Sequence, residues 1–239
     1  MNTASEERMK AVILAGGEGR RLHPYTLTIP KPMMPIGDRP ILELLVGLLR
    51  RHGISDLVLA TGHFDEIIRG HFGDGRDFGV SIRYSKEESA LGTAGPLAVL
   101  RTALDRTFLV LNGDIFADLD LGVIIADHRH RASDATVVLA RHAETLQFGV
   151  VSLDEHGNVS SWDEKPVVER LVSAGAYVME PATLAHLEPS AYADLPDLVM
   201  ALVGARLRVR GYVHPGYWYD IGRPADYERA CAAARVAQQ

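Results

Sequence analysis

One stretch near the start of the chain strongly limits what this sequence can fold into. The apolar run Ala11–Ala15 leads directly into the glycine-rich segment 16–19. Such a run followed by glycines is typical of a buried strand that opens into a loop, whose bare backbone N–H groups can approach a phosphate. Arg20, Arg21 and Lys31 add positive charge around this loop. The stretch therefore predicts a strand with a polyphosphate-binding loop at its end.

Two common phosphate-binding loops do not match this segment. The dinucleotide fingerprint needs a third glycine where this chain has Leu22, and the P-loop needs a Gly-Lys-Ser/Thr triplet, which the segment lacks. A tight surface turn is the plain alternative. It is less favoured because Pro30 and Pro32 flank Lys31, and each proline fixes its own φ and biases the preceding residue toward extended geometry.

The order of predicted elements indicates the class of fold. Up to residue 133, short buried strands such as Asp56–Thr61 and Phe108–Leu111 alternate with amphipathic helices such as 40–53 and Asp65–Phe72. Beyond residue 133 strand-like stretches dominate, with a hairpin turn at 155–158. The pattern predicts an α/β fold: a Rossmann-like mixed, mostly parallel sheet flanked by helices, with an added small β-rich lobe.

Length and composition are compatible with one domain. The 239 residues are 47% hydrophobic, which is enough for a substantial core, and no linker rich in Pro, Gly or Ser divides them. We expect a flexible leader over residues 1–8 and a single domain over 9–239. Within that domain, residues 9–133 would form the core and residues 134–239 the added lobe.

Charge and hydropathy exclude several partners. A formal net charge of -6 argues against binding nucleic acid through general electrostatics, which needs a net basic face. No apolar run approaches the span of a bilayer, and the polar start MNTASEER lacks the apolar stretch of a secretion signal. We therefore expect a cytoplasmic protein that binds neither nucleic acid nor membrane. Whether it forms a homo-oligomer is left open by the sequence.

The single cysteine, Cys231, excludes an internal disulfide and a cysteine-based metal cluster.

Two aspartates stand at predicted strand ends. Asn112-Gly113-Asp114 follows one apolar run, and Asp220 follows Tyr217–Tyr219. Crevices beyond strand ends are where open α/β sheets bind ligands. Either aspartate alone is more often a turn former or helix cap. Together they suit Mg²⁺, which prefers a few carboxylate oxygens and takes its other ligands from water and substrate phosphates.

The glycine-rich stretch resembles the signature of the sugar-1-phosphate nucleotidyltransferases, which join a nucleoside triphosphate to a sugar 1-phosphate and release pyrophosphate. The matching sequence is LAGGEGRRLHPYTLTIPKPMMPI, followed in family order by ALGTAGPL at 90–97, LNGDI at 111–115, FGVV at 148–151, DEKP at 163–166, SAGAYV at 173–178 and WYDIGRPADY at 218–227. The resemblance covers nearly the whole chain from Met9 onward. It implies a nucleotide-binding core over 9–133 and a sugar-phosphate-binding lobe over 134–239. Some relatives carry a C-terminal β-helix, which we do not expect here.

The resemblance also implies a role for each matching residue. Asp114 and Asp220 would hold Mg²⁺, Arg20 and Lys31 would stabilise the leaving pyrophosphate, and Lys165 would hold the attacking phosphate. The nucleotide would contact Leu14, Ala15, Gly16, Gly17, Gly19, Glu87, Gly92, Thr93, Asn112 and Gly113. The sugar phosphate would contact Gly149, Glu164, Lys165 and Gly175. By itself, a Glu-Lys pair such as Glu164-Lys165 is usually a solvated surface feature.

Glu87 bears on which nucleotide is used. A carboxylate only accepts hydrogen bonds, and guanine offers adjacent N–H donors where uracil and thymine offer a single ring N–H. The segment YSKEESALGTAGPL is most similar to the guanylyltransferase branch that uses mannose or heptose 1-phosphate, so GTP is favoured. Some uridylyltransferases also have a glutamate there, and a solvated Glu87 is the plain alternative. Many relatives have Asn-Ala-Gly where this chain has Ser173-Ala174-Gly175, which leaves the sugar open.

Other classes of function stay open beside a guanylyltransferase. One is a uridylyl- or thymidylyltransferase acting on another hexose 1-phosphate. A second is a regulatory relative that binds nucleotide without turnover, although such a protein usually lacks one of the charged positions named above, and all are present. The third is a nicotinamide-binding oxidoreductase, which Leu22 in place of a glycine disfavours.

Overall fold

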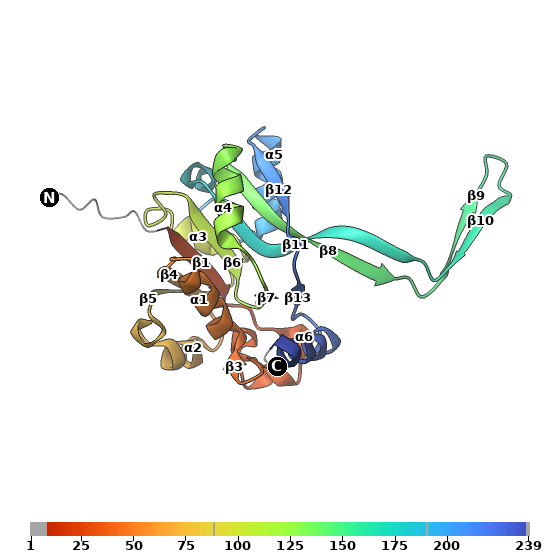
Figure 1. The fold of residues 1–239 in the computed structure, drawn as a ribbon. Helices are drawn as coiled ribbons and strands as arrows, with labels where there is room; N and C mark the ends of the chain where they lie inside the picture. The colour runs from red at the N-terminus through yellow and green to blue at the C-terminus, as the bar shows by residue number, and fades with distance from the viewer. Residues whose placement is uncertain (1–8, 88, 190, 238–239) are drawn as a thin grey trace.

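The computed structural model describes residues 9–87, 89–189 and 191–237 (Figure 1), so the predicted leader, residues 1–8, lies outside the described residues. The strands are β1 (Lys10–Ala15), β2 (Pro35–Ile36), β3 (Arg39–Pro40), β4 (Asp56–Thr61), β5 (Ser81–Lys86), β6 (Phe108–Asn112), β7 (Ile115–Ala117), β8 (Ala135–Thr145), β9 (Gly149–Leu153), β10 (Val159–Glu164), β11 (Val167–Met179), β12 (Val209–Val213) and β13 (Trp218–Asp220). The α-helices are α1 (Ile41–Arg51), α2 (Asp65–Phe72), α3 (Gly95–Val99), α4 (Leu121–His130), α5 (Leu195–Gly204) and α6 (Pro224–Ala237). Short 3-10 helices are η1 (Arg20–Leu22), η2 (Tyr25–Leu27), η3 (Lys31–Met33), η4 (Arg76–Phe78) and η5 (Pro181–His186).

Seven strands form the central sheet in the order β12-β8-β11-β6-β1-β4-β5. Strands β6, β1, β4 and β5 run parallel, β11 is antiparallel to both β6 and β8, and β12 is parallel to β8. The predicted mixed, mostly parallel sheet flanked by helices is therefore confirmed. Strands from both halves of the chain share this one sheet.

Alternation along the strands divides the core between the two faces of the sheet. In β1, Ala11 and Ile13 pack with α1, α2 and α4, whereas Val12 packs with α3, α5 and η5, because successive strand side chains point to opposite faces. All three side chains are fully buried. A third cluster contains Leu22 and Ile36 together with Ala230 of α6, so it joins α6 to the segment that follows the glycine loop.

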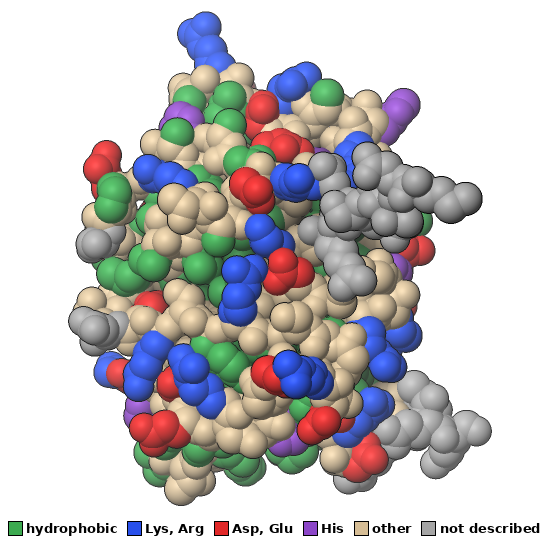
Figure 2. All heavy atoms as spheres, turned by 90° about the vertical axis from the view of Figure 1, so that its left-hand side faces the viewer, with side chains coloured by type: hydrophobic (Ala, Val, Ile, Leu, Met, Phe, Trp, Pro, Cys, Tyr) green, Lys and Arg blue, Asp and Glu red, His purple; other side chains and the backbone are tan. Residues whose placement is uncertain are grey.

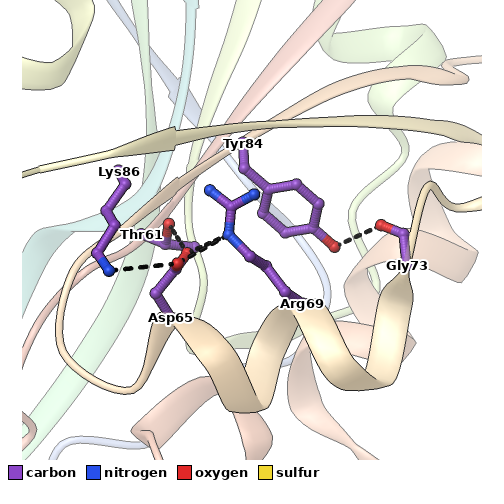
Figure 3. A network of polar contacts seen from close by, with 6 residues as sticks. All are labelled: Thr61, Asp65, Arg69, Gly73, Tyr84 and Lys86. Atoms are coloured by element: carbon purple, nitrogen blue, oxygen red, sulfur yellow. Dashed lines mark hydrogen bonds and ion pairs between the residues drawn. The ribbon is translucent and has the colours of Figure 1, made fainter.

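A polar network holds α2 against the edge of the sheet (Figure 3). The buried Asp65 carboxylate accepts hydrogen bonds from Thr61 Oγ1 at 2.5 Å and from Arg69 Nε at 2.7 Å, with Lys86 Nζ 3.7 Å away. Burial raises the pKa of Asp65, but the hydrogen bonds from Thr61 and Arg69 outweigh it and hold the pKa below its usual value. The Arg69 guanidinium lies 4.3 Å from the centre of the Tyr84 ring.

Strands β8 and β11 continue beyond the sheet as a two-stranded ribbon that carries the hairpin β9–β10 at its far end (Figure 1). We call residues 141–173, all of which are described, the arm. No side chain of the arm is buried. The arm forms much of the β-rich lobe that the sequence predicts, and it projects away from the body of the molecule.

The face on the side away from the arm carries interspersed basic and acidic side chains rather than a patch of one sign (Figure 2). No helix among the described residues combines the length and apolar character needed to cross a bilayer.

Candidate functional site

A cavity of about 850 Å³ opens where β1, β4 and β6 end. Its lining includes most of the residues predicted to bind nucleotide, pyrophosphate or metal: Leu14, Ala15, Gly16, Gly17, Gly19, Arg20, Lys31, Glu87, Gly92, Thr93, Asn112 and Asp114. It also includes residues that the sequence reasoning did not select: Glu18, Arg21, Pro32, Gly62, His63, Ser89, Ala90, Tyr192, Asp194 and Gly222. The structure thus brings together side chains from both ends of the chain.

The two predicted metal ligands come together through a short antiparallel pair of strands. Asp114 directly precedes β7, and the register of β7 with β13 sets Asp220 opposite Ile115, the next residue after Asp114. Lys31, nearly buried, donates a hydrogen bond to Asp114 Oδ2 in a close ion pair. Burial raises the pKa of Asp220, Lys31 lowers it and Asp114 raises it again, so the pKa lies above its usual value. Two carboxylates and one ammonium therefore share one partly desolvated place.

This donor set is compatible with a hard divalent cation. Within the described residues, no group of three or more His, Cys, Asp or Glu side chains is arranged to hold a metal ion. An ion here would have two carboxylates and would take its other ligands from water and phosphate, which is how Mg²⁺ is usually bound. The half-buried Asp220 carboxylate beside Asp114 is electrostatically unfavourable alone, and a cation would offset that repulsion.

The glycine loop lies between β1 and this acidic pair. The Gly113 N–H donates to Leu14 O at 2.8 Å, so the ends of β1 and β6 are held side by side. Arg20 is exposed and pairs with Glu18 at the mouth of the cavity. The loop therefore offers backbone N–H groups and basic side chains beside the carboxylates.

Glu87 lies on the other side of the loop. Its Oε2 accepts a hydrogen bond from the Leu91 N–H at 3.0 Å, and its own N–H donates to Thr61 O at 2.9 Å. Burial raises the pKa of Glu87, and the Leu91 N–H only partly offsets this. Glu87 is thus a fixed, half-buried acceptor in the cavity wall and not a freely solvated side chain.

Asp194 holds the neighbouring wall, and the sequence reasoning missed it. Its Oδ1 accepts from the Thr93 N–H at 2.9 Å, and its Oδ2 accepts from the Tyr192 hydroxyl at 2.9 Å. The Thr93 N–H is the main group that lowers the pKa of Asp194. An aspartate directly before Leu-Pro is a signal for the start of a helix, and Asp194 does cap α5. Nothing in the local sequence links that cap to Thr93.

Asn112 presents an unsatisfied polar atom at the cavity. Its Oδ1 is buried and has no hydrogen-bond partner among the described residues. Gly175, predicted to contact the sugar phosphate, lies against it with φ +75°, and a Cβ there would meet Asn112 Nδ2 at 2.6 Å. A residue with a side chain would displace Asn112, so glycine is needed here on both counts.

The structure does not bring the remaining predicted sugar-phosphate residues to this cavity. Gly149, Glu164 and Lys165 lie on the arm, and none of them lines the cavity. The Glu164 and Lys165 side chains are exposed. The cavity of a single chain is therefore lined by most of the residues predicted for the nucleotide and by Asp114, with Asp220 beside it, but not by the lysine predicted for the second substrate.

The mostly parallel sheet flanked by helices, with a glycine-rich loop at its strand ends, defines an α/β protein. Comparison with family models makes this specific: the model described as nucleotidyl transferase matches residues 10–236, and the chain belongs to that family.

Individual relatives agree with this assignment. The chain is 38% identical to a UTP–glucose-1-phosphate uridylyltransferase from Synechocystis sp. over 93% of its length, and 34% identical to a mannose-1-phosphate guanylyltransferase from Mycobacterium tuberculosis over 94%. It spans 62% and 64% of those two relatives.

Solved structures share the fold. One is the crystal structure of a Bacillus anthracis protein that is named as a glucose-1-phosphate thymidylyltransferase and contains sucrose. It superposes with a TM-score of 0.77 at 26% identity, and the match covers 95% of each chain. HddC from Yersinia pseudotuberculosis gives 0.75 at 24% identity, covering 94% of this chain and 99% of that one.

Proposed function

We propose that this protein transfers a nucleotidyl group from a nucleoside triphosphate to a sugar 1-phosphate, with GTP and mannose or heptose 1-phosphate favoured. The observation that carries the proposal is the cavity lined by the glycine loop, Lys31 and Asp114, with Asp220 set beside Asp114 by the pairing of β7 with β13. A triphosphate needs backbone N–H donors, fixed cations and a metal within reach of one another. This cavity supplies the first two and the ligands for the third.

The reaction requires charge control more than proton transfer. An oxygen of the sugar phosphate attacks the α-phosphorus in line, a new P–O bond forms, and the bond to the bridging oxygen breaks so that pyrophosphate leaves with that electron pair. The attacking phosphate is already ionised, so no general base is needed. Positioning and placement of positive charge can supply most of the catalysis in such phosphoryl chemistry.

Each charged group then has a distinct task. The loop N–H groups, Arg20 and Lys31 would bind the phosphates that leave, and Lys165 would hold the attacking phosphate, with Glu164 accepting hydrogen bonds from sugar hydroxyls. Asp114 and Asp220 would hold Mg²⁺. When bound, the ion would neutralise charge on the phosphates. Lys31 lies at the acidic pair itself, so it can shift its contact from Asp114 to an incoming phosphate.

The choice of base rests on Glu87 and its neighbours. A half-buried carboxylate that is already oriented by the Leu91 N–H can accept from guanine N–H donors without further ordering. The unsatisfied Asn112 Oδ1 and the Gly175 backbone beside it would lie between nucleotide and sugar. The M. tuberculosis relative is named as a guanylyltransferase and supports GTP, whereas the Synechocystis relative is named as a uridylyltransferase and supports the alternative, UTP with a hexose 1-phosphate.

A pyrophosphate-release assay over a grid of nucleoside triphosphates and sugar 1-phosphates, with Mg²⁺, tests the proposal. We expect turnover, highest with GTP and mannose or heptose 1-phosphate. If turnover is highest with UTP or dTTP, the preference for GTP is wrong, and the proposed nucleotidyl transfer still stands. Nucleotide binding with no turnover for any pair would overturn the proposal and favour a regulatory protein that binds nucleotide without catalysis.

A further inference from the structure

We propose that the arm completes the cavity of a second copy of this chain, so that each sugar-phosphate site is assembled from two protomers. The inference rests on the proposed function of Lys165 and deepens it by naming where that lysine acts. Two observations lie behind it. The arm carries β10, which ends at Glu164, away from the body of the molecule (Figure 1), and neither Glu164 nor Lys165 lines the cavity of its own chain.

The β8–β11 ladder fixes how far Lys165 lies from its own cavity. Gly175, in β11, lies against the cavity residue Asn112. Lys165 lies just before β11, nine residues before Ala174, the neighbour of Gly175. At about 3.3 Å per extended residue, this separation is about 30 Å. The pairing runs without a register shift from Ser173↔Leu139 to Val167↔Thr145, and the one irregularity lies nearer the body, between Ser173 and Tyr177. Folding back onto its own cavity would break this ladder.

The arm has the surface of an interface that lacks its partner. Phe148 is 78% exposed, Trp162 66%, Val159 64% and Leu153 62%. Large exposed apolar clusters usually mark interaction sites, and an isolated two-stranded hairpin is marginally stable in water. The hydrogen bonds of the arm tip stay within the arm, as in Leu146 N–H to Pro166 O at 3.0 Å. The arm therefore needs a surface other than its own.

The tip is already organised around the residues in question. The Trp162 indole N–H donates to Glu164 Oε2 at 3.1 Å, and a Cβ at the facing Gly149 would meet that indole at 2.8 Å. Lys165 has φ +50°, a left-handed backbone that is unfavourable for a residue other than glycine. Strained residues of this kind are often found at functional sites. An oriented Glu164 carboxylate and an exposed Lys165 are thus presented together, away from the cavity of their own chain.

A second copy is the partner that fits these observations. Every copy has a cavity without Lys165 and an arm without a partner, so reciprocal exchange about a two-fold axis satisfies both at once. The arm, residues 141–173, is also long enough to supply one side of a standard interface, which takes about 20–30 residues. An unrelated protein would cover the apolar surface but leave the cavity incomplete.

Mixed dimers test the exchange. Two differently tagged full-length chains, one with Asp114→Asn and one with Lys165→Ala, are co-expressed and the mixed dimer is isolated through both tags. Its pyrophosphate release is measured with the best substrate pair from the grid, with the sugar 1-phosphate kept below its KM. One of its two sites combines an intact cavity from the Lys165→Ala chain with an intact arm from the Asp114→Asn chain. We expect each variant alone to lose turnover and the mixed dimer to regain about half of wild type.

A matched control and the contrary outcomes follow from the same design. A mixed dimer of Asp114→Asn with Asp220→Asn must stay inactive, because both changes affect a cavity and mixing restores neither. If both single variants and the Asp114→Asn/Lys165→Ala dimer are inactive, or if the active wild-type protein is a monomer, the exchange is overturned while the proposed function stands. If Lys165→Ala alone keeps wild-type turnover, the role of Lys165 fails and the exchange fails with it.

Discussion

The body of the molecule and the arm are both built on β-strands, but the central strands of the body are buried and those of the arm are exposed. In the sheet, Ile13 and Leu57 are fully buried and the cavity residues are fixed by strand pairing on both sides. In the arm no side chain is buried, and the apolar side chains of its hairpin face solvent. The nucleotide half of the proposed site is thus built into a rigid core, whereas the sugar-phosphate half is carried on a part that gains its environment from elsewhere.

The largest contrast is expected between a leucine of the core and a leucine of the arm, in how much its replacement by alanine lowers the free energy of unfolding. Leu57→Ala removes a fully buried side chain and should lower the free energy of unfolding by about 2–5 kcal/mol. Leu153→Ala, on a side chain that is 62% exposed, should change it by no more than about 0.5 kcal/mol in protein too dilute for copies to associate. Urea unfolding of both variants measures the contrast. Equal losses would mean that the arm packs against its own body.

Asp114→Asn separates chemistry from folding within the body. It removes a charge from the acidic pair and should lower kcat by about 10²–10³, as loss of one electrostatic group in a preorganised site does. The unfolding midpoint should stay close to wild type. Asp105→Asn, an exposed aspartate paired with Lys10 away from the cavity, is the control and should leave kcat unchanged. A wild-type kcat for Asp114→Asn would remove it from the site.

The Asp65 network gives the stability of the body a dependence on pH. The folded-state pKa of Asp65 is lowered, so its stabilising contribution is complete above the unfolded-state pKa of about 3.9 and is lost as pH falls through the lower folded-state value. Asp65→Asn should cost about 1–3 kcal/mol at pH 7, and the difference from wild type should shrink below pH 3.9. Unfolding curves across that range check this. A difference that is constant with pH would contradict the assignment.

Glu87→Gln should have the smallest effect of these substitutions, a change in the preference for GTP over UTP. The change keeps the hydrogen bond from Leu91 available but removes the charge and one acceptor oxygen. The ratio of kcat/KM for GTP to that for UTP should fall about 10-fold, or about 1.4 kcal/mol. Glu66→Gln, an exposed residue on α2, is the control. An unchanged ratio would exclude Glu87 from reading the base.

Local patterns predicted most of the body and failed where contacts are distant. The strand Asp56–Thr61 and the helix Asp65–Phe72 are confirmed at both ends, because a short apolar run and a glycine stop are local signals. Helix α4 has no predicted counterpart, since Leu121, Ile124 and His128 bury a narrow stripe in a mixed polar run. Asp194 could be recognised only as a helix cap, because its contact with Thr93 spans 101 residues.

The arm shows a further limit of sequence reasoning. The strands around Gly149 and Glu164 were predicted, and their hairpin is present. Their direction was not, because a two-residue period defines the faces of a strand but not the course of the ribbon relative to the body. The predicted roles of Glu164 and Lys165 therefore stay predictions that depend on where the arm docks.

If a cavity that holds the nucleotide and an arm that holds the sugar phosphate act on one reaction, then Lys165→Ala must affect the sugar phosphate and spare the nucleotide. Initial rates are measured while each substrate is varied in turn, with Arg170→Ala on the same ribbon as the control. The account predicts a fall in kcat/KM for the sugar 1-phosphate of about 10–100-fold, as expected when one charged hydrogen bond is lost, with KM for the nucleotide unchanged. An unchanged kcat/KM for the sugar 1-phosphate would contradict it.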